Sequence, residues 1–544
     1  MKVVIRCDAA PAIGTGHVVR CLTLAERLRA GGAQVRFICR AHPGHMAGAI
    51  TARGFAVDLL PAPIAAGTTA LAAASRSAST APQQPQQQQQ PPPHAAWLGV
   101  GWRQDAADTL AALAACADAA EGAHGPGGAN PDWLIVDHYG IDAAWQRAVR
   151  PAVQRLMVID DLADRPHDCD LLLDQNLSEV GPARYAGLVP PHCQLLCGPR
   201  YALLRDEFAQ ARAALAPRSG QLQRLLVFIG GADLHDETGR VLDALAELHA
   251  AGQPLAADVV VGAAYAPHEA LAARCLALPG VRLHRQVSNM AELMAGADLA
   301  VGAGGGAMWE RCSVGLPAIV LAVADNQRPG CEAMGRAGAA LYLGGPGPDS
   351  GARLLAALRL AGASPWLLQH LAAASLALVD GLGAARVARR LAALPLAAGL
   401  RLRPATAGDC DAVWAWRNDD TVRRHSGDSA ALPLAAHRQW YAGVLADPQR
   451  QLLLAEIGTE VAGVLRYDRK QNQATISVYL TPAFLGKGIG AVLLEQGSAW
   501  VARHWAGVDT IEALVRPQNL ASAEAFATAG FSLEFDIYRL RIKP

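Results

Sequence analysis

The sequence of 544 residues predicts an α/β protein built from two similar halves, followed by a smaller domain of mixed strands and helices. Three observations predict this fold class. Short apolar runs alternate with helical spacing in two successive regions, glycine-rich turns follow several of these runs, and the pattern changes near residue 400. A strand, a helix and a strand in this order form a parallel, right-handed unit. A chain of this length also exceeds a single hydrophobic core.

The first α/β half is expected over residues 1–215. Residues 2–7 are an apolar run typical of a buried parallel strand, residues 18–30 have helical spacing, and a second strand follows at 35–39. Three further strands are expected, at residues 133–137, 156–160 and 171–174. Charged residues stand at their carboxyl ends, where open α/β sheets bind ligands. A tract rich in Gln and Pro, about residues 64–95, has the composition of a disordered surface insertion, and we assign it no function.

The second half, residues 216–395, repeats the α/β pattern. Its strands are expected at 225–229, 258–261, 299–301 and 318–323. Two halves of similar size favour a cleft between them. The third domain, residues 400–544, has alternating strands expected at 452–456, 461–467 and 475–480, and then a glycine-rich loop before a helix at 491–500.

Composition limits the partners. The 48 basic and 48 acidic residues give no net charge, which favours neither nucleic acid nor an anionic membrane as a partner. The N-terminus lacks the pattern of a signal peptide, and no run of about 18 uncharged apolar residues is present. The 11 cysteines are scattered, as in a reducing compartment. A soluble cytoplasmic protein is expected, and no protein partner is predicted.

The strongest signal in the first half is the turn Gly14-Thr15-Gly16-His17. A glycine-rich turn at a helix start presents free N–H groups to an anion. His17 falls in the first turn of the helix, where the positive end of the dipole disfavours a charged ring, so we expect this ring to accept a proton. Spacing alone also fits a tight turn with a capping histidine.

Further polar residues follow the strands of this half. His138, between Asp137 and Tyr139, stands at a strand end, and we interpret it as a substrate contact; a histidine that satisfies a loop is the alternative. The pair Asp160-Asp161 is expected to cap a loop more than to bind a metal, because no third ligand stands at a suitable spacing.

Two glycine-rich loops are candidate phosphate sites. Gly302 to Gly306 joins a buried strand to a helix but lacks the Lys-Ser/Thr end of an ATP-binding loop. Glu310, one turn into that helix, can accept hydrogen bonds from a ribose, or it can be a solvated helix-face residue. Leu485 to Gly490 follows a strand and opens a helix, so its N–H groups can cradle a pyrophosphate.

Taken together, these motifs resemble the UDP-sugar hydrolases of pseudaminic acid biosynthesis over residues 1 to about 395. The motifs that carry the resemblance are Ile5-Arg6-Cys7-Asp8, Gly14 to Leu22, Val136 to Tyr139, Ile159 to Ala163, Leu173 to Asn176, Gly198 to Tyr201, Gly230 to Asp233, Val287 to Met290 and Gly302 to Glu310. The resemblance implies the GT-B architecture, two Rossmann-type domains. It also implies removal of UDP from UDP-2,4-diacetamido-2,4,6-trideoxy-β-L-altropyranose.

The resemblance implies a role for each site residue. His17 would be the general base that activates water, with inversion and without a metal. The substrate would contact residues of both halves: Gly14, Thr15, Gly16, Asp137, His138, Tyr139, Gly231, Gly304, Gly305, Glu310, Asn326 and Gln327. One departure concerns the loop after the glycines, where the family carries hydroxyl residues and this chain has Gly306-Ala307-Met308. That departure puts the affinity for the diphosphate in question.

Residues 400–544 resemble the GNAT N-acetyltransferases, which implies acetyl-CoA as the acetyl donor. The residues that match the cofactor-binding positions are Leu480, Gly486, Lys487, Gly488, Ile489, Gly490 and Asn519. Two positions depart from the family. Leu485 stands where a basic or amide residue is usual, and Phe526 stands where a tyrosine acid is common. Tyr479, Glu456 and Tyr538 are the alternatives for the acid.

The resemblances predict a bifunctional enzyme that acetylates the 4-amino group of a UDP-sugar and then hydrolyses the product. This pairing is inferred from the presence of both parts in one chain. One alternative is a UDP-sugar glycosyltransferase, and another is a sugar-binding module without catalysis. In either case the C-terminal domain could acetylate a protein or a small amine.

Overall fold

The computed structural model describes residues 1–63, 92–121, 130–230, 233, 235–262, 265, 268–425 and 429–534. Most of the Gln- and Pro-rich tract, together with Gly231 and Tyr538, lies outside the described residues. The chain divides into two compact units, Met1–Ala388 and Arg389–Pro544.

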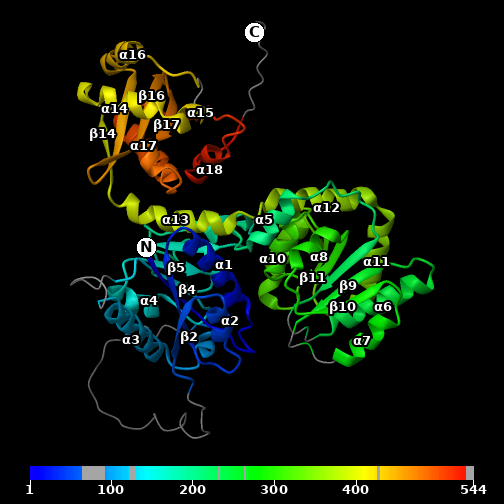
Figure 1. The fold of residues 1–544 in the computed structure, drawn as a ribbon. Helices are drawn as coiled ribbons and strands as arrows, with labels where there is room; N and C mark the ends of the chain where they lie inside the picture. The colour runs from blue at the N-terminus through cyan, green and yellow to red at the C-terminus, as the bar shows by residue number, and fades with distance from the viewer. Residues whose placement is uncertain are drawn as a thin grey trace, which may run out of the picture. The chain divides into compact units, whose positions relative to one another are not determined.

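The first unit begins with a seven-stranded sheet in the order β3-β2-β1-β4-β5-β6-β7, and every neighbouring pair is parallel. Apolar residues of α3 and α4 pack against one face, and α1 and α2 lie on the other side (Figure 1). The strands are β1 (Lys2–Cys7), β2 (Gln34–Arg40), β3 (Ala56–Leu60), β4 (Trp133–Asp137), β5 (Leu156–Ile159), β6 (Leu171–Asp174) and β7 (Gln194–Cys197). The helices are α1 (Gly16–Ala30), α2 (Ala47–Ala52), α3 (Trp102–Glu121) and α4 (Ala143–Val149).

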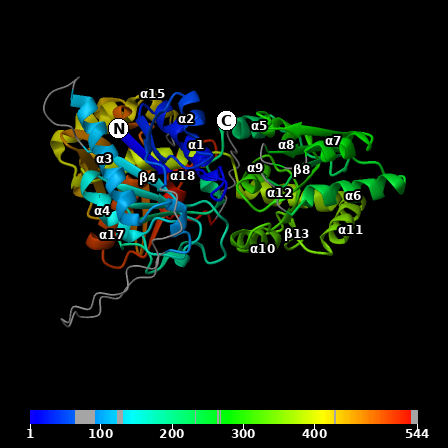
Figure 2. The ribbon, with the colours of Figure 1, turned by 90° about the horizontal axis from the view of Figure 1, so that it is seen from below.

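A second parallel sheet follows in the same unit, in the order β10-β9-β8-β11-β12-β13. Helices cover both faces of this sheet (Figure 2). Helices α6, α7 and α11 contribute to the hydrophobic core on one face, and α5, α8, α9 and α10 contribute to the core on the other face. The strands are β8 (Arg224–Phe228), β9 (Ala256–Val261), β10 (Val281–Arg285), β11 (Leu299–Ala303), β12 (Ala318–Leu321) and β13 (Leu341–Tyr342). The helices are α5 (Asp206–Ala213), α6 (Glu237–Ala250), α7 (His268–Leu276), α8 (Met290–Gly296), α9 (Ala307–Ser313), α10 (Arg328–Arg336) and α11 (Ser350–Ala363).

Both sheets run outward from a central strand in two directions, which is the doubly wound order. The prediction of two Rossmann-type halves is therefore confirmed, and their pairing is the GT-B-like architecture. In each sheet the order reverses beside the central strand, between β1 and β4 and between β8 and β11. The carboxyl ends at these two points are where such sheets bind ligands.

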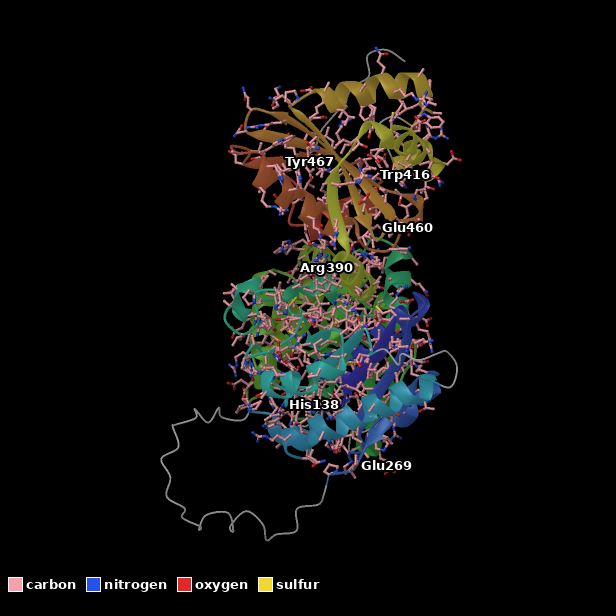
Figure 3. The ribbon with its side chains drawn as sticks, turned by 90° about the vertical axis from the view of Figure 1, so that its left-hand side faces the viewer. His138, Glu269, Arg390, Trp416, Glu460 and Tyr467 are labelled. Carbon is pink, nitrogen blue, oxygen red and sulfur yellow. The ribbon has the colours of Figure 1, made fainter. Side chains whose placement is uncertain are left out.

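The second unit contains a five-stranded sheet in the order β14-β15-β16-β17-β18. All pairs are antiparallel except β17 and β18, which are parallel. Tyr467 of β16 is fully buried in the core of this unit (Figure 3). The strands are β14 (Leu400–Pro404), β15 (Arg450–Ile457), β16 (Glu460–Lys470), β17 (Gln473–Leu480) and β18 (Thr510–Ala513). The helices are α14 (Cys410–Asn418), α15 (Asp420–His425), α16 (Leu434–Ala446), α17 (Gly490–His504) and α18 (Leu520–Thr528).

The boundary of the second unit lies about ten residues earlier than the start expected from sequence at residue 400. Helix α13 (Gly383–Ala397) explains the difference. Its residue Ala393 is fully buried in the core formed by β15, β16 and α17. The end of this helix therefore belongs to the C-terminal core.

One helical stretch in the described part of the chain, residues 365–397, meets the length and composition of a membrane span. It consists of α12 (Pro365–Leu378) and α13, and residues 379–382 between them are not helical. Each helix alone is shorter than the roughly 20 residues that cross a bilayer. Because 44% of the most apolar window is buried inside the protein, this stretch is weak evidence for a membrane span.

Candidate functional site

The turn before α1 places His17 at the carboxyl end of the first sheet. Gly14 has φ +80°, a conformation that favours glycine, and its N–H donates to the Ala10 carbonyl at 2.8 Å. Thr15 precedes the helix without capping it through its side chain, and a Cβ on Gly16 would meet open space. The turn therefore exposes its backbone. His17 follows in the first turn, with a side chain only 8% exposed.

Asp137 is the partner of His17. It ends β4, next to Cys7 of β1, and its Oδ1 lies 2.6 Å from the His17 Nδ1. Arg20, one turn further along α1, donates to both carboxylate oxygens, from Nε and from Nη2, each at 2.6 Å. Burial by itself would raise the pKa of Asp137, but the Arg20 guanidinium and His17 outweigh burial and hold this pKa well below its ordinary value.

An ionised Asp137 fixes the tautomer of His17. A carboxylate only accepts hydrogen bonds, so in the neutral form of the ring the proton lies on Nδ1 and the lone pair lies on Nε2. Among the described residues, we find no protein hydrogen-bond partner for Nε2. A ring held at one nitrogen and open at the other is the arrangement of a general base.

Aromatic side chains enclose the same ring. The Tyr139 ring meets His17 edge-on with centroids 4.7 Å apart, and the centroid of Trp97 lies 6.4 Å from that of His17. Trp97 and Tyr139 stack on each other at 5.7 Å. The Tyr139 hydroxyl donates to Asp161, and burial together with that carboxylate raises the pKa of Tyr139, which stays a neutral phenol. The wall beside the histidine is therefore apolar and uncharged.

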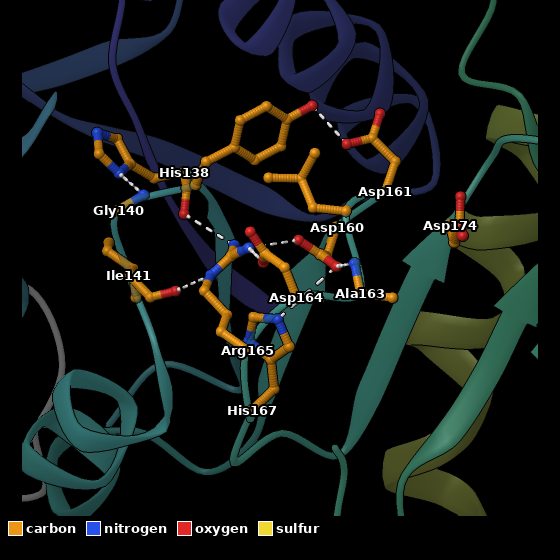
Figure 4. A network of polar contacts seen from close by, with 12 residues as sticks. His138, Gly140, Ile141, Asp160, Asp161, Ala163, Asp164, Arg165, His167 and Asp174 are labelled. Atoms are coloured by element: carbon orange, nitrogen blue, oxygen red, sulfur yellow. Dashed lines mark hydrogen bonds and ion pairs between the residues drawn. The ribbon is translucent and has the colours of Figure 1, made fainter. Parts of the chain in front are cut away.

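His138 has surroundings different from those we expected. It is 2% exposed, and its Nδ1 accepts the Gly140 N–H at 3.0 Å (Figure 4). Its Nε2 faces Asp8 at 3.5 Å. Burial lowers the pKa of His138 to about 4, so that it is neutral near pH 7. The structure therefore favours the alternative given for this residue, a histidine that satisfies a loop, over a contact with substrate.

The adjacent aspartates have separate partners (Figure 4). Asp160 accepts the Ala163 N–H at 2.9 Å, as expected of a loop cap, and pairs with Arg165 at 3.0 Å. Asp161 accepts from Tyr139 and lies 3.6 Å from Arg20, so it belongs to the surroundings of His17. Within the described ranges, no group of three or more His, Cys, Asp or Glu side chains could hold a metal ion. A metal-independent reaction stays a prediction.

The glycine loop between β11 and α9 is tightly packed at one position and open at the next two. A Cβ on Gly304 would lie 2.1 Å from the Cys331 sulfur, so packing requires glycine there. A Cβ on Gly305 would come no nearer than 3.8 Å to any atom, the nearest being the Gln327 Nε2, and Gly306 has open space around it. The backbone of Gly305 and Gly306 can therefore approach a ligand such as a phosphate.

Glu310, Asn326 and Gln327, which we predicted to contact the substrate, lie near this loop in sequence or in space. Glu310 is 20% exposed and lies 3.7 Å from Arg205, and burial raises its pKa. It is therefore no ordinary solvated residue. Gln327 accepts the Val323 N–H through Oε1, which leaves its Nε2 directed at the loop, whereas Asn326 is exposed.

The structure thus brings the predicted residues into two groups. His17, Asp137 and Tyr139 lie together at the first sheet, and Gly304, Gly305, Glu310 and Gln327 gather at the second. Sequence reasoning missed Arg20, Asp161, Trp97 and Asn176 as individual residues. The position of Arg20 three residues after His17, on the same helix face, is a signal that could have found it.

In the second unit the predicted cofactor loop joins β17 to α17. Gly486 and Gly488 both have φ +76°, and a Cβ on Gly488 would lie 2.7 Å from the Arg389 carbonyl oxygen. Lys487 lies over the Phe484 ring at 4.6 Å. The Asn519 Oδ1 accepts the Ser522 N–H at the start of α18, which leaves its amide N–H groups for a ligand. This loop fits the acetyl-CoA that the resemblance implies.

The candidates for the acid are partly occupied. The Tyr479 hydroxyl donates to the Val413 carbonyl at 3.3 Å, and burial raises the pKa of Tyr479. Glu456 accepts from Arg403 at 2.7 Å. Phe526 is 7% exposed and packs against Phe531. None of these contacts assigns the acid.

Both parts of the chain are similar to known proteins. Residues 399–532 match the family model described as an acetyltransferase (GNAT) domain. Over 79 residues the chain is 40% identical to the UDP-2,4-diacetamido-2,4,6-trideoxy-β-L-altropyranose hydrolase of Campylobacter jejuni, which is 14% of this chain and 28% of that protein. Over 168 residues it is 30% identical to the spore coat polysaccharide biosynthesis protein SpsG of Bacillus subtilis, 30% of this chain and 48% of that protein.

The matched part of the chain therefore spans less than half the length of these curated relatives. Among solved structures, MurG of Acinetobacter baumannii superposes with a TM-score of 0.47 at 13% identity and covers 72% of this chain and 99% of its own. The chain thus joins two Rossmann-type halves, partly similar in sequence to a UDP-sugar hydrolase, to residues 399–532, which match the GNAT acetyltransferase model.

Proposed function

We propose that the first unit hydrolyses a UDP-sugar, with His17 as the general base. The observation that carries this proposal is the hydrogen bond between His17 and the ionised Asp137, which leaves the His17 Nε2 free to take a proton. The partial similarity to the hydrolase of Campylobacter jejuni supports UDP-2,4-diacetamido-2,4,6-trideoxy-β-L-altropyranose as the substrate.

The proposed reaction needs one base and a stabilised leaving group. A water oxygen forms a bond to the anomeric carbon while Nε2 of His17 takes its proton. The bond between that carbon and the diphosphate oxygen breaks, and UDP leaves with the electron pair. Attack opposite to UDP inverts the anomeric centre. A positioned general base contributes about 10²–10⁴ to the rate.

The diphosphate would lie at the glycine loop. Backbone N–H groups of Gly305 and Gly306 can donate to it, and they replace the hydroxyl donors that Ala307 and Met308 lack. Gln327 and Glu310 would contact the nucleotide. Because backbone donors are fixed before the substrate binds, they can stabilise the charge that develops on the leaving oxygen.

For the second unit we propose transfer of an acetyl group to the 4-amino group of a UDP-sugar. Acetyl-CoA supplies the acetyl group. The loop from Gly486 to Gly490 would hold its pyrophosphate, and Asn519 would bind the pantetheine arm. Acetylation would then supply the substrate of the first unit, so the two units of the chain would carry out consecutive reactions in the cytoplasm.

The experiment follows both reactions in one tube by mass spectrometry, with the 4-amino UDP-sugar and acetyl-CoA. We expect acetylation and then release of UDP. His17→Ala should stop UDP release and leave acetylation unchanged. Transfer of the sugar to an added hydroxyl acceptor would instead support a glycosyltransferase. Binding of the UDP-sugar by calorimetry without turnover would support a sugar-binding module, and equal UDP release by His17→Ala would exclude the proposed base.

A further inference from the structure

Asn176 connects the two halves of the first unit through one side chain. Its Nδ2 donates to the Asp161 Oδ2 at 3.1 Å, and its Oδ1 accepts from the Trp309 Nε1 at 3.1 Å. A carboxylate only accepts hydrogen bonds and an indole N–H only donates them. The two partners therefore fix the orientation of this amide, and no apolar side chain could satisfy both.

Each partner of Asn176 leads to one of the two candidate groups. Trp309, which is 1% exposed, lies in α9, and its backbone N–H donates to the Gly306 carbonyl of the glycine loop at 3.1 Å. On the other side, Asp161 lies 3.6 Å from Arg20, and Arg20 donates to Asp137, the partner of His17. A continuous series of polar contacts thus connects the glycine loop to His17.

Burial distinguishes this connection from an ion pair that also joins the two halves but is exposed. Arg336 of α10 also reaches back to the first half, where it pairs with Glu179, but both side chains are more than half exposed. Such pairs are weakened by water and salt. The Asn176 bond to Trp309 involves a tryptophan that is almost fully buried, so it can fix the position of α9.

We propose that Asn176 is a positioning residue that couples occupancy of the glycine loop by a nucleoside diphosphate to the orientation of His17. The proposal rests on the function proposed above. Binding of the diphosphate at Gly305 and Gly306 acts on the Gly306 carbonyl and on Trp309. Asn176 passes this constraint to Asp161 and Arg20, and so to the carboxylate that orients the base.

The test removes first one of the two hydrogen bonds and then both. Trp309→Phe removes only the indole donor, and Asn176→Ala removes both bonds. We expect each variant to lower kcat for UDP release about tenfold or more, with a smaller change in KM, as for a lost interaction that holds a catalytic group. The double variant should lose no more activity than Asn176→Ala alone, because that variant already removes both bonds of the connection.

Trp145→Phe is the matched control. Trp145 is fully buried and donates its indole N–H to the Asp105 carboxylate at 2.9 Å, a bond that includes neither His17 nor the glycine loop. We expect this variant to lose thermal stability but to keep kcat. If Trp309→Phe behaves in the same way, or if the losses of the two single variants multiply, the coupling is refuted.

A second measurement separates this inference from the proposed hydrolysis. UDP is titrated into the protein while the imidazole signals of His17 are followed by NMR and assigned with His17→Ala. We expect a shift in the wild type that is lost in Asn176→Ala and in Trp309→Phe. If the protein binds UDP and shows this pattern but releases no UDP from a UDP-sugar, the coupling stands and the proposed hydrolysis fails. A shift that persists in both variants, or is missing from the wild type, overturns the coupling.

Discussion

Replacing Asp137 by asparagine keeps the shape of the side chain and removes its negative charge. Every position around the carboxylate faces a donor. Oδ1 receives His17 and Arg20, and Oδ2 receives Arg20 and, at 3.4 Å, the Cys21 thiol. An amide group in this place would point its own N–H at one of these donors. If the N–H faces His17, the ring proton moves to Nε2, and the base loses its lone pair at that atom.

The magnitude follows from the bond that is lost. A hydrogen bond to a charged group contributes about 1.5–3 kcal/mol. Since about 1.4 kcal/mol corresponds to a factor of ten in rate, loss of orientation alone lowers kcat about 10- to 150-fold. The upper limit is set by His17→Ala, which removes the whole contribution of a general base, about 10²–10⁴. We therefore expect Asp137→Asn to fall between the wild type and His17→Ala.

The assay is UDP release at saturating UDP-sugar, with thermal unfolding measured on the same samples. Asp58→Asn is the control, because Asp58 is also paired with an arginine, Arg36, but on β3 at the edge of the same sheet. We expect this control to keep kcat. A kcat for Asp137→Asn within about twofold of the wild type, beside an inactive His17→Ala, would refute the idea that the carboxylate orients the base.

Three further predictions concern other parts of the chain. Gly304→Ala should lower the free energy of unfolding by about 1–3 kcal/mol through overpacking, whereas Gly305→Ala should keep the melting temperature and weaken UDP binding in calorimetry; equal melting temperatures for the two would contradict this. Burial raises the pKa of Asp174 to about 6, so the folded protein binds this proton more tightly than the unfolded chain. Stability due to Asp174 is then full below about pH 4 and falls by up to about 3 kcal/mol as pH rises through 6. Asp174→Asn should remove that fall from a plot of melting temperature against pH, and an unchanged plot would argue against it. Gly488→Ala, at a positive φ and beside a backbone carbonyl, should weaken acetyl-CoA binding and leave UDP release unchanged; loss of both activities would point to misfolding.

The strands were predictable because buried parallel strands are short, continuous apolar runs. The runs at 2–7, 133–137 and 171–174 match β1, β4 and β6 residue for residue. The predictions missed β3, β7, β10, β13 and β18, which are partly exposed and carry no long apolar run. The family-model match begins at residue 399, next to the predicted start at 400, but the compact unit begins earlier, at Arg389. That earlier start was not predictable, because the apolar face of α13 gives no indication of the core on which it packs.

Residue types at the site were predictable, but their pairing was not. The glycine turn pointed to His17, and the strand end pointed to Asp137, yet 120 residues separate the two and no local pattern states that they meet. His138 is the opposite case. A histidine at a strand end suggested a ligand contact, but it is the burial of its ring against Asp8 and Gly140 that decides its role, and burial is set by tertiary packing.

The surroundings of His17 also bear on the choice between hydrolysis and sugar transfer. Both reactions need a base that takes a proton from the nucleophile attacking the anomeric carbon. The pairing of His17 with Asp137 therefore serves either reaction. They differ in the size of the nucleophile that must reach Nε2. With Tyr139 and Trp97 against the ring, only 8% of the His17 side chain is exposed, and a small nucleophile fits this access better than a bulky alcohol. Trp97, which supplies one wall of the site, lies in the short helix Ala95–Leu98. In the sequence this helix stands next to the Gln- and Pro-rich tract, to which we assign no function. This enclosure favours water as the nucleophile and therefore hydrolysis.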